Sequence, residues 1–169
     1  VLVDTTCGSV LNVWKRVDAY ARDGYTAIIH GKHYHEETKA TASQVTKYPG
    51  GRYLVVYDMN EARLVCDFIE GRASALAARF AGKTSPAFDF NADLTRVGIA
   101  NQTTMLAGES LAIAAEFGKS MARRYGEAHR DEHFRSFDTI CSATQERQDA
   151  VLALLEDQHR VLRVVHHEA

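Results

Sequence analysis

The two residues best suited to metal chemistry are Cys7 and Cys141, because they stand in nearly the same local sequence. Asp4-Thr5-Thr6-Cys7 near one end of the chain is almost repeated as Asp138-Thr139-Ile140-Cys141 near the other. An apolar pattern of helical spacing follows each cysteine, and a helix N-terminus favours a thiolate over a thiol. Two thiolates from distant parts of the sequence can converge on one iron–sulfur cluster. The alternative is that both cysteines are small buried residues at strand–helix corners.

Three polar side chains in loops could carry the remaining chemistry. His35 and Glu37 lie two positions apart in a polar stretch, where an imidazole can hold a phosphate oxygen and a carboxylate can carry a proton. Thr103 supplies a hydroxyl directly after a strand-like segment. Each also has an ordinary interpretation, because most His-x-Glu pairs are solvated surface and such a threonine usually caps a helix or a turn.

The composition is that of a globular chain without a strong electrostatic bias. Of 169 residues 46% are hydrophobic, and 20 Lys+Arg against 22 Asp+Glu leave a formal charge of −2. No overall basic field points to nucleic acid or to an anionic membrane, so any anion site must be local. No apolar run approaches the roughly 18–20 residues that cross a bilayer. The 3 widely spaced cysteines fit no disulfide framework and favour a reducing compartment.

Strand, loop and helix alternate along the chain, which predicts an α/β fold of parallel strands joined by crossover helices. The expected strands are 25–29, 53–57 and 97–100. Helices are expected after Cys7, over 60–69 and 109–125, and after Cys141, and 39–46 is expected to be a short helix or a turn. The segment 71–96 interrupts this alternation and reads as an insertion. Cys66 lies on an apolar helical stripe and is expected in the core. Residues 1–3 and 161–165 also look like strands.

The candidate loops follow strands, and open α/β sheets place their ligand sites at the carboxyl ends of strands. We therefore expect Cys7, Glu37, Thr103 and Cys141 to converge, although they lie far apart in the sequence. No Gly-rich phosphate loop of the GxxxxGK[ST] or GxGxxG type is present, so nucleotide binding has little support.

Several blocks of the sequence occur together in one order. They are Asp4-Thr5-Thr6-Cys7, His30-Gly31-Lys32, His35-Glu36-Glu37-Thr38 with Ala40-Thr41-Ala42-Ser43, Ala100-Asn101-Gln102-Thr103-Thr104-Met105-Leu106, and Thr139-Ile140-Cys141 with Ala143-Thr144-Gln145-Glu146-Arg147-Gln148. In this order the blocks resemble the family of 4-hydroxy-3-methylbut-2-enyl diphosphate reductase, and its plant and cyanobacterial branch most of all. The resemblance extends over almost the whole chain, to about Val165.

The resemblance implies reductive dehydroxylation of this diphosphate to isopentenyl and dimethylallyl diphosphate, the last step of the methylerythritol phosphate pathway. A ferredoxin- or flavodoxin-type donor would supply the electrons. The implied fold is a set of repeated small parallel-sheet domains packed around a shared [4Fe–4S] cluster held by three cysteines. By position, the resemblance implies that Cys7 and Cys141 are two of the cluster ligands. It implies that Glu37 is the carboxylate that takes part in proton delivery and that Thr103 is the hydroxyl that contacts the substrate oxygen. It also implies that His35 is a histidine that lines the pocket near the diphosphate.

The sequence departs from the family pattern at both ends, so we expect an internal fragment that is inactive alone. The third cluster cysteine is expected upstream of Val1, and the Ser-x-Asn diphosphate motif is expected where the chain reads His166-His167-Glu168-Ala169. Residues 1–7 would end one domain, 8–136 would form a middle α/β domain with an insertion at about 71–96, and 137–169 would begin a third.

The location implied by the resemblance is the plastid stroma for a plant or algal source and the cytoplasm for a cyanobacterial or bacterial one. Two other interpretations remain open at this point. One is a non-enzymatic α/β fragment in which no cluster assembles. The other is a small module that binds anions at the helix N-termini beside Cys7 and Cys141.

Overall fold

A computed structural model of the chain describes residues 6–137 and 141–167. The strand expected at 1–3 lies outside these residues, as do Asp4, Thr5 and the tripeptide before Cys141.

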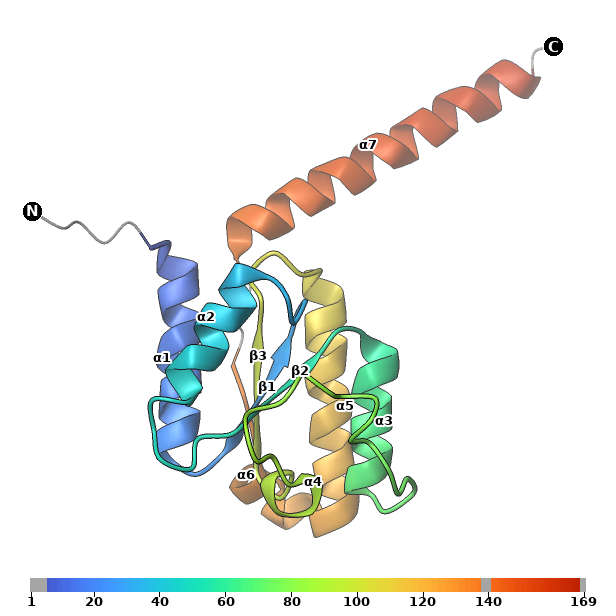
Figure 1. The fold of residues 1–169 in the computed structure, drawn as a ribbon. Helices are drawn as coiled ribbons and strands as arrows, with labels where there is room; N and C mark the ends of the chain where they lie inside the picture. Colours follow the sequence, from blue (N-terminus) through green and yellow to red (C-terminus); the bar gives the residue numbers. More distant parts are fainter. Residues whose placement is uncertain (1–5, 138–140, 168–169) are drawn as a thin grey trace, which may run out of the picture.

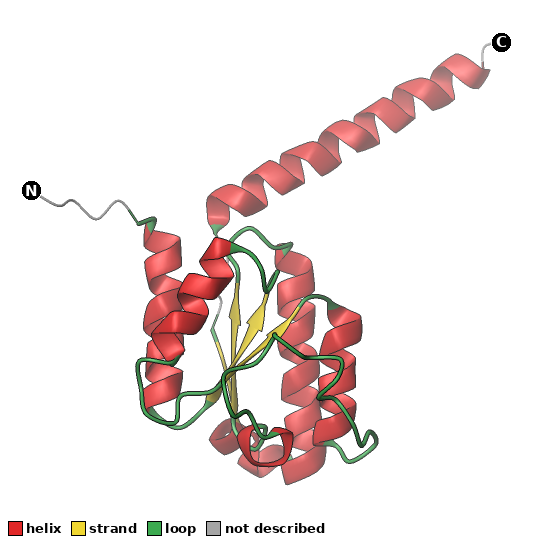
Figure 2. Ribbon diagram, in the orientation of Figure 1, coloured by secondary structure: helices red, strands yellow, loops and turns green. Residues whose placement is uncertain are grey.

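The described chain is built on one four-stranded parallel sheet with the order β2-β1-β3-β4 (Figures 1 and 2). The strands are β1 (Thr26–His30), β2 (Tyr53–Val56), β3 (Val97–Asn101) and β4 (Phe134–Ser136). The register pairs His30 with Val56 on one side and with Asn101 on the other. The carboxyl ends of the three predicted strands are therefore level, and the loops that follow them share one edge. This confirms the predicted α/β class.

Helices cover both faces of the sheet and make three layers. On one side lie α1 (Gly8–Arg22) and α2 (Glu36–Val45), and on the other lie α3 (Met59–Ile69) and α5 (Ala107–Tyr125) (Figure 1). Because successive side chains of a strand point to opposite faces, Ile28 enters the α3–α5 core while Ala27 and Ile29 enter the α1–α2 core.

Tyr20 fixes α1, which carries Cys7 at its start, against the middle of the sheet. Its hydroxyl donates to the Ile99 carbonyl at 3.0 Å. A Cβ at Gly98 would lie 2.6 Å from atoms of the Tyr20 ring, so the ring can lie on β3 only because this strand residue is glycine. Burial, opposed by the nearby Arg16 and Arg135 charges, raises the pKa of the Tyr20 hydroxyl.

The segment 71–96 is attached to the sheet rather than looped away from it. Val55 N–H donates to the Lys83 carbonyl at 2.7 Å, Ser85 N–H donates to the Tyr53 carbonyl at 3.0 Å, and the segment also contains the short helix α4 (Phe90–Asp93). These bonds cover the outer edge of β2, an edge that would otherwise be open to pairing with another chain. Three of its apolar residues also enter the α3–α5 core; they are Leu76, Phe80 and Leu94.

The path from α5 to β4 was not predicted from the sequence. It consists of a 3₁₀ turn (Glu127–His129), α6 (Arg130–His133) and then β4. β4 has only 3 residues, Phe134-Arg135-Ser136, none of them buried. Without an apolar run or a regular alternation, the sequence carries no strand signal there.

The strand expected at 161–165 is wrong, because α7 runs without a break from Ser142 to His167. A short run of valines and leucines fits a buried strand, but Val161, Leu162, Val164 and Val165 also recur at helical spacing. Figure 1 shows α7 extending away from the sheet and its helices. Among the described residues, no helix is both long and apolar enough to span a membrane.

Cys66 lies in the α3–α5 core, as predicted. It is 1% exposed, and burial raises the pKa of its thiol to about 12. Its backbone carbonyl accepts a hydrogen bond from the Ser120 hydroxyl at 3.3 Å. Such a thiol stays protonated and packs as a small apolar group, so it is no metal ligand.

Candidate active site at the carboxyl edge of the sheet

Glu37 and Thr103 meet at the carboxyl edge of the sheet, although 66 positions separate them. The Thr103 N–H donates to Glu37 Oε1 at 2.6 Å, and the Thr103 hydroxyl donates to Glu37 Oε2 at 3.0 Å. Thr103 is buried and Glu37 is half-buried. One residue therefore binds both carboxylate oxygens, and a proton can pass between carboxyl and hydroxyl over a single hydrogen bond. The predicted convergence of these two residues is confirmed.

The first turn of α2 sets the position of Glu37. His35 is the N-cap residue of this helix, and its Nδ1 accepts the Glu37 N–H at 3.2 Å. An accepting Nδ1 leaves the proton of a neutral ring on Nε2. The acidic Glu36 and Glu37 are favourably placed at the positive end of the helix dipole. His35 is thus a neighbour of Glu37 with an exposed ring that caps the helix through one nitrogen.

Cys7 and Cys141 stand at helix starts, as the sequence predicts. Cys7 is the N-cap residue of α1 and is exposed, and Cys141 directly precedes α7 and is half-buried. The Thr144 N–H, and after it the hydroxyls of Thr144 and Ser9, lower the pKa of the Cys141 thiol. Since Ser9 lies two positions after Cys7, this hydrogen bond brings the N-termini of α1 and α7 together. Hydrogen bonds of this kind favour the thiolate.

The described residues contain no group of three or more His, Cys, Asp or Glu side chains arranged to hold a metal ion. Cys141 and the α1 N-terminus nevertheless provide a set of two thiols at neighbouring helix starts, positions that favour thiolates. Cys66 does not extend this set, because it lies in the core on the other face of the sheet.

Two buried polar residues at the same edge were missed by sequence reasoning. Gln102 is 4% exposed and bonds to both loops of the site. His30, at the end of β1, is fully buried with its Nδ1 at 2.8 Å from the Ser110 hydroxyl, and burial lowers the pKa of its ring. The sequence feature that could have revealed both residues is a polar residue at the carboxyl end of an apolar strand-like run.

We expect alkylation by iodoacetamide to distinguish the cysteines. The rate of alkylation follows the thiolate fraction, and a free cysteine is half thiolate at a pH of about 8.5. Because the pKa of Cys141 is lowered, the rise of its alkylation rate with pH should come at lower pH than for free cysteine. Cys66 should stay unmodified in the folded chain. Peptide mapping by mass spectrometry over a pH series measures the extent of alkylation at Cys141 and at Cys66. Thr144→Val should move the Cys141 curve to higher pH, and a Cys141 curve equal to that of free cysteine would contradict the assigned hydrogen bonds.

A family model for the LytB protein matches residues 1–168. The chain belongs to the LytB protein family. Within this family it is similar to reductases of cyanobacteria. It is 48% identical over 166 residues to the 4-hydroxy-3-methylbut-2-enyl diphosphate reductase of Synechococcus sp. (strain RCC307), with 97% of this chain and 40% of the relative covered. It is 52% identical over 167 residues to the reductase of the same name from Gloeobacter violaceus, with 98% and 39% covered. The LytB-family chain thus spans about 40% of the length of these curated relatives.

Two solved structures share the fold. One is the E-1-hydroxy-2-methyl-but-2-enyl-4-diphosphate reductase of Plasmodium falciparum, with a TM-score of 0.54, 19% identity, and 88% of this chain and 36% of that one covered. The other is described as (E)-4-hydroxy-3-methyl-but-2-enyl diphosphate reductase, the terminal enzyme of the non-mevalonate pathway, with a TM-score of 0.54, 23% identity, and 90% and 41% covered. At these identities the likeness establishes the fold of the LytB-family chain.

Proposed function

We propose that this LytB-family chain is part of a reductase that converts 4-hydroxy-3-methylbut-2-enyl diphosphate to isopentenyl and dimethylallyl diphosphate. The observation that carries the proposal is the Glu37–Thr103 pair, in which both carboxylate oxygens are bound by one residue at a strand terminus. The two cyanobacterial relatives that bear this enzyme name support the choice of reaction.

The proposed chemistry removes the 4-hydroxyl of the substrate as water and consumes two electrons and two protons. In the proposed step the Thr103 hydroxyl gives its own proton to the leaving oxygen, and a protonated Glu37 replaces that proton across the 3.0 Å contact between Glu37 Oε2 and Thr103 Oγ1. Protonation turns a poor leaving group into water. His35, the neighbour of Glu37 in sequence, meets the diphosphate with its Nε2 while its Nδ1 caps α2.

Cys7 and Cys141 are the proposed ligands for a [4Fe–4S] cluster. Their positions at adjoining helix N-termini and the lowered pKa of the Cys141 thiol fit a thiolate ligand set. When bound, the cluster would deliver the two electrons and act as a Lewis acid at the substrate oxygen. A third cysteine would come from another part of the protein, since Cys66 lies in the core.

The domain division and the partners belong to the same proposal. Residues 8–136 would be a middle α/β domain, and residues 137–169, which include α7, would begin the next. The exposed apolar residues of α7 fit a helix that packs on a further sheet; they are Val151, Leu152, Leu154 and Leu155. We propose a ferredoxin- or flavodoxin-type electron donor, with the protein in the cytoplasm of a cyanobacterial or bacterial source or in the plastid stroma of a plant or alga.

A chimera tests the proposal. Residues 1–168 replace the matching segment of the Synechococcus reductase, which this chain matches at 48% identity. After anaerobic reconstitution with iron and sulfide we expect a brown protein that reduces the diphosphate substrate with a reduced ferredoxin. The parent reductase is the control. A chimera that folds but stays colourless and inactive would favour a non-enzymatic fragment. Thermal stabilisation by phosphate without colour would favour an anion-binding module.

A further inference from the structure

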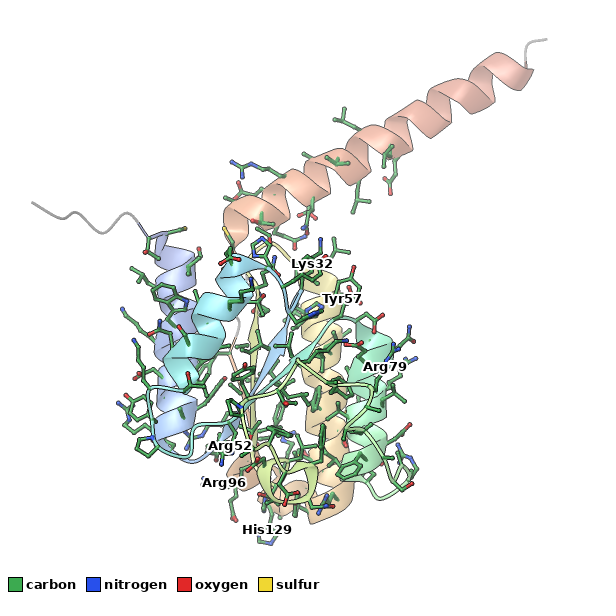
Figure 3. The ribbon with its side chains drawn as sticks, in the orientation of Figure 1. Lys32, Arg52, Tyr57, Arg79, Arg96 and His129 are labelled. Atoms are coloured by element: carbon green, nitrogen blue, oxygen red, sulfur yellow. The ribbon has the colours of Figure 1, made fainter. Side chains whose placement is uncertain are left out.

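The side-chain amide of Gln102 joins the two loops that carry Glu37 and Thr103. Its Oε1 accepts the Lys32 N–H at 3.1 Å and the Thr38 hydroxyl at 3.2 Å, and its Nε2 donates to the Thr104 hydroxyl at 2.6 Å. Lys32 lies in the loop after β1, at the upper end of the sheet in Figure 3. One buried amide therefore links the loop after β1, the first turn of α2 and the loop after β3.

Two of the three partners of this amide are sequence neighbours of the two site residues. Thr38 follows Glu37, and Thr104 follows Thr103. Any shift of α2 relative to the loop after β3 would have to stretch the Gln102 bonds before it separated Glu37 from Thr103. Gln102 thus sets the distance between the carboxyl and the hydroxyl through bonds of its side-chain amide to Lys32, Thr38 and Thr104.

The orientation and the packing of Gln102 leave it little freedom. Because the Lys32 N–H can only donate, the oxygen of the amide must face the loop after β1, and the nitrogen must face Thr104. A Cβ at Gly31 would lie 2.9 Å from both Gln102 Cβ and Thr38 Oγ1, so these groups lie close against the glycine backbone. Gln102 N–H also donates to the His30 carbonyl at 2.8 Å, which fixes its backbone to β1.

We propose that Gln102 is a positioning residue that holds Glu37 and Thr103 in reacting geometry. In the proposed function, which this inference extends, the pair must meet the leaving hydroxyl together. Loosening one loop would leave binding of the diphosphate nearly intact and would lower the rate of the chemical step. A misplacement of about 1 Å at a reacting group can cost roughly 10²-fold in rate.

Gln102→Met tests the inference, because methionine has a similar length and makes none of the three bonds. In the 169-residue chain we expect the Thr103 amide, which donates to Glu37 Oε1, to exchange its hydrogen about tenfold faster or more. The amide of Ile99 in the β3 ladder should keep its exchange rate. Gln44→Met is the matched control, because Gln44 lies on α2 and its side chain bonds to the Ala40 carbonyl at 3.5 Å and to the Lys47 ammonium, neither of which is in the loops that carry Glu37 and Thr103.

A second variant keeps the inference testable if Gln102→Met does not fold. Thr104→Val removes the Nε2 bond alone at an exposed residue and should speed Thr103 exchange by a smaller factor. In the active chimera, Gln102→Met should lower kcat about 10–100-fold and leave KM within a few-fold. Unchanged Thr103 exchange in both folded variants would overturn the positioning role. Faster exchange with unchanged kcat would confirm that Gln102 holds the loops and would instead count against Glu37 and Thr103 as the reacting pair.

Discussion

Replacing Glu37 by Gln is expected to lower turnover of the chimera by about 10²–10⁴-fold while the cluster and its colour remain. Glutamine keeps the side-chain volume and can still accept the Thr103 N–H through its oxygen. Its NH₂ group takes the place of the oxygen that accepts the Thr103 hydroxyl, and it cannot carry a proton to the leaving group. Steady-state kcat and visible absorbance of the same sample measure the two effects.

Glu36→Gln is the matched control for this experiment. Glu36 precedes Glu37 in the first turn of α2 and pairs with Lys39 at 2.8 Å, and its side chain is 87% exposed. The Lys39 hydrogen bond lowers the pKa of Glu36, but a surface pair of this kind contributes little to stability. Turnover should therefore stay near that of the unsubstituted chimera. Loss of colour in Glu37→Gln equal to its loss of activity would make Glu37 a structural residue.

The strands and helices that position the site were predictable because each has a strong periodic signal. Residues 25–29, 53–57 and 97–100 are apolar runs and became β1, β2 and β3 with shifts of one residue at most. Their common direction followed from the helices between them, since crossover connections give parallel strands. With the carboxyl ends level, the meeting of Glu37 and Thr103 could be anticipated from the sequence.

The parts that could not be predicted depend on tertiary contacts. β4 is a strand because β3 offers it a partner, as the pairs from Val97–Phe134 to Ile99–Ser136 show, while its own residues carry no pattern. The run at 161–165 fits both a strand and a helix by periodicity, and the structure has a helix. Gln102 and His30 are buried polar residues, and their roles follow from partners on remote elements, which are the loop after β1 for Gln102 and α5 for His30.

The proposed role of Cys7 and Cys141 as cluster ligands leads to the second large expected effect. Cys141→Ser in the chimera should prevent cluster assembly and reduce turnover to background. A serine hydroxyl stays protonated near neutral pH and is a hard, weak ligand for iron, whereas the hydrogen bonds from Thr144 and Ser9 favour a thiolate at this position. Iron and sulfide content per chain, together with visible absorbance, measures the loss directly.

Cys66→Ser is the control that separates ligation from folding. It introduces a hydroxyl into an apolar core site that is 1% exposed, at a cost of about 1–3 kcal/mol in the free energy of unfolding. Its colour should match that of the unsubstituted chimera, while its urea midpoint falls. If Cys66→Ser loses the cluster at a temperature where the protein is folded, or if Cys141→Ser keeps it, then the helix starts of α1 and α7 are not where the cluster binds. Cys7→Ser should behave as Cys141→Ser does, because the Ser9 contact places both cysteines at the same junction of helices.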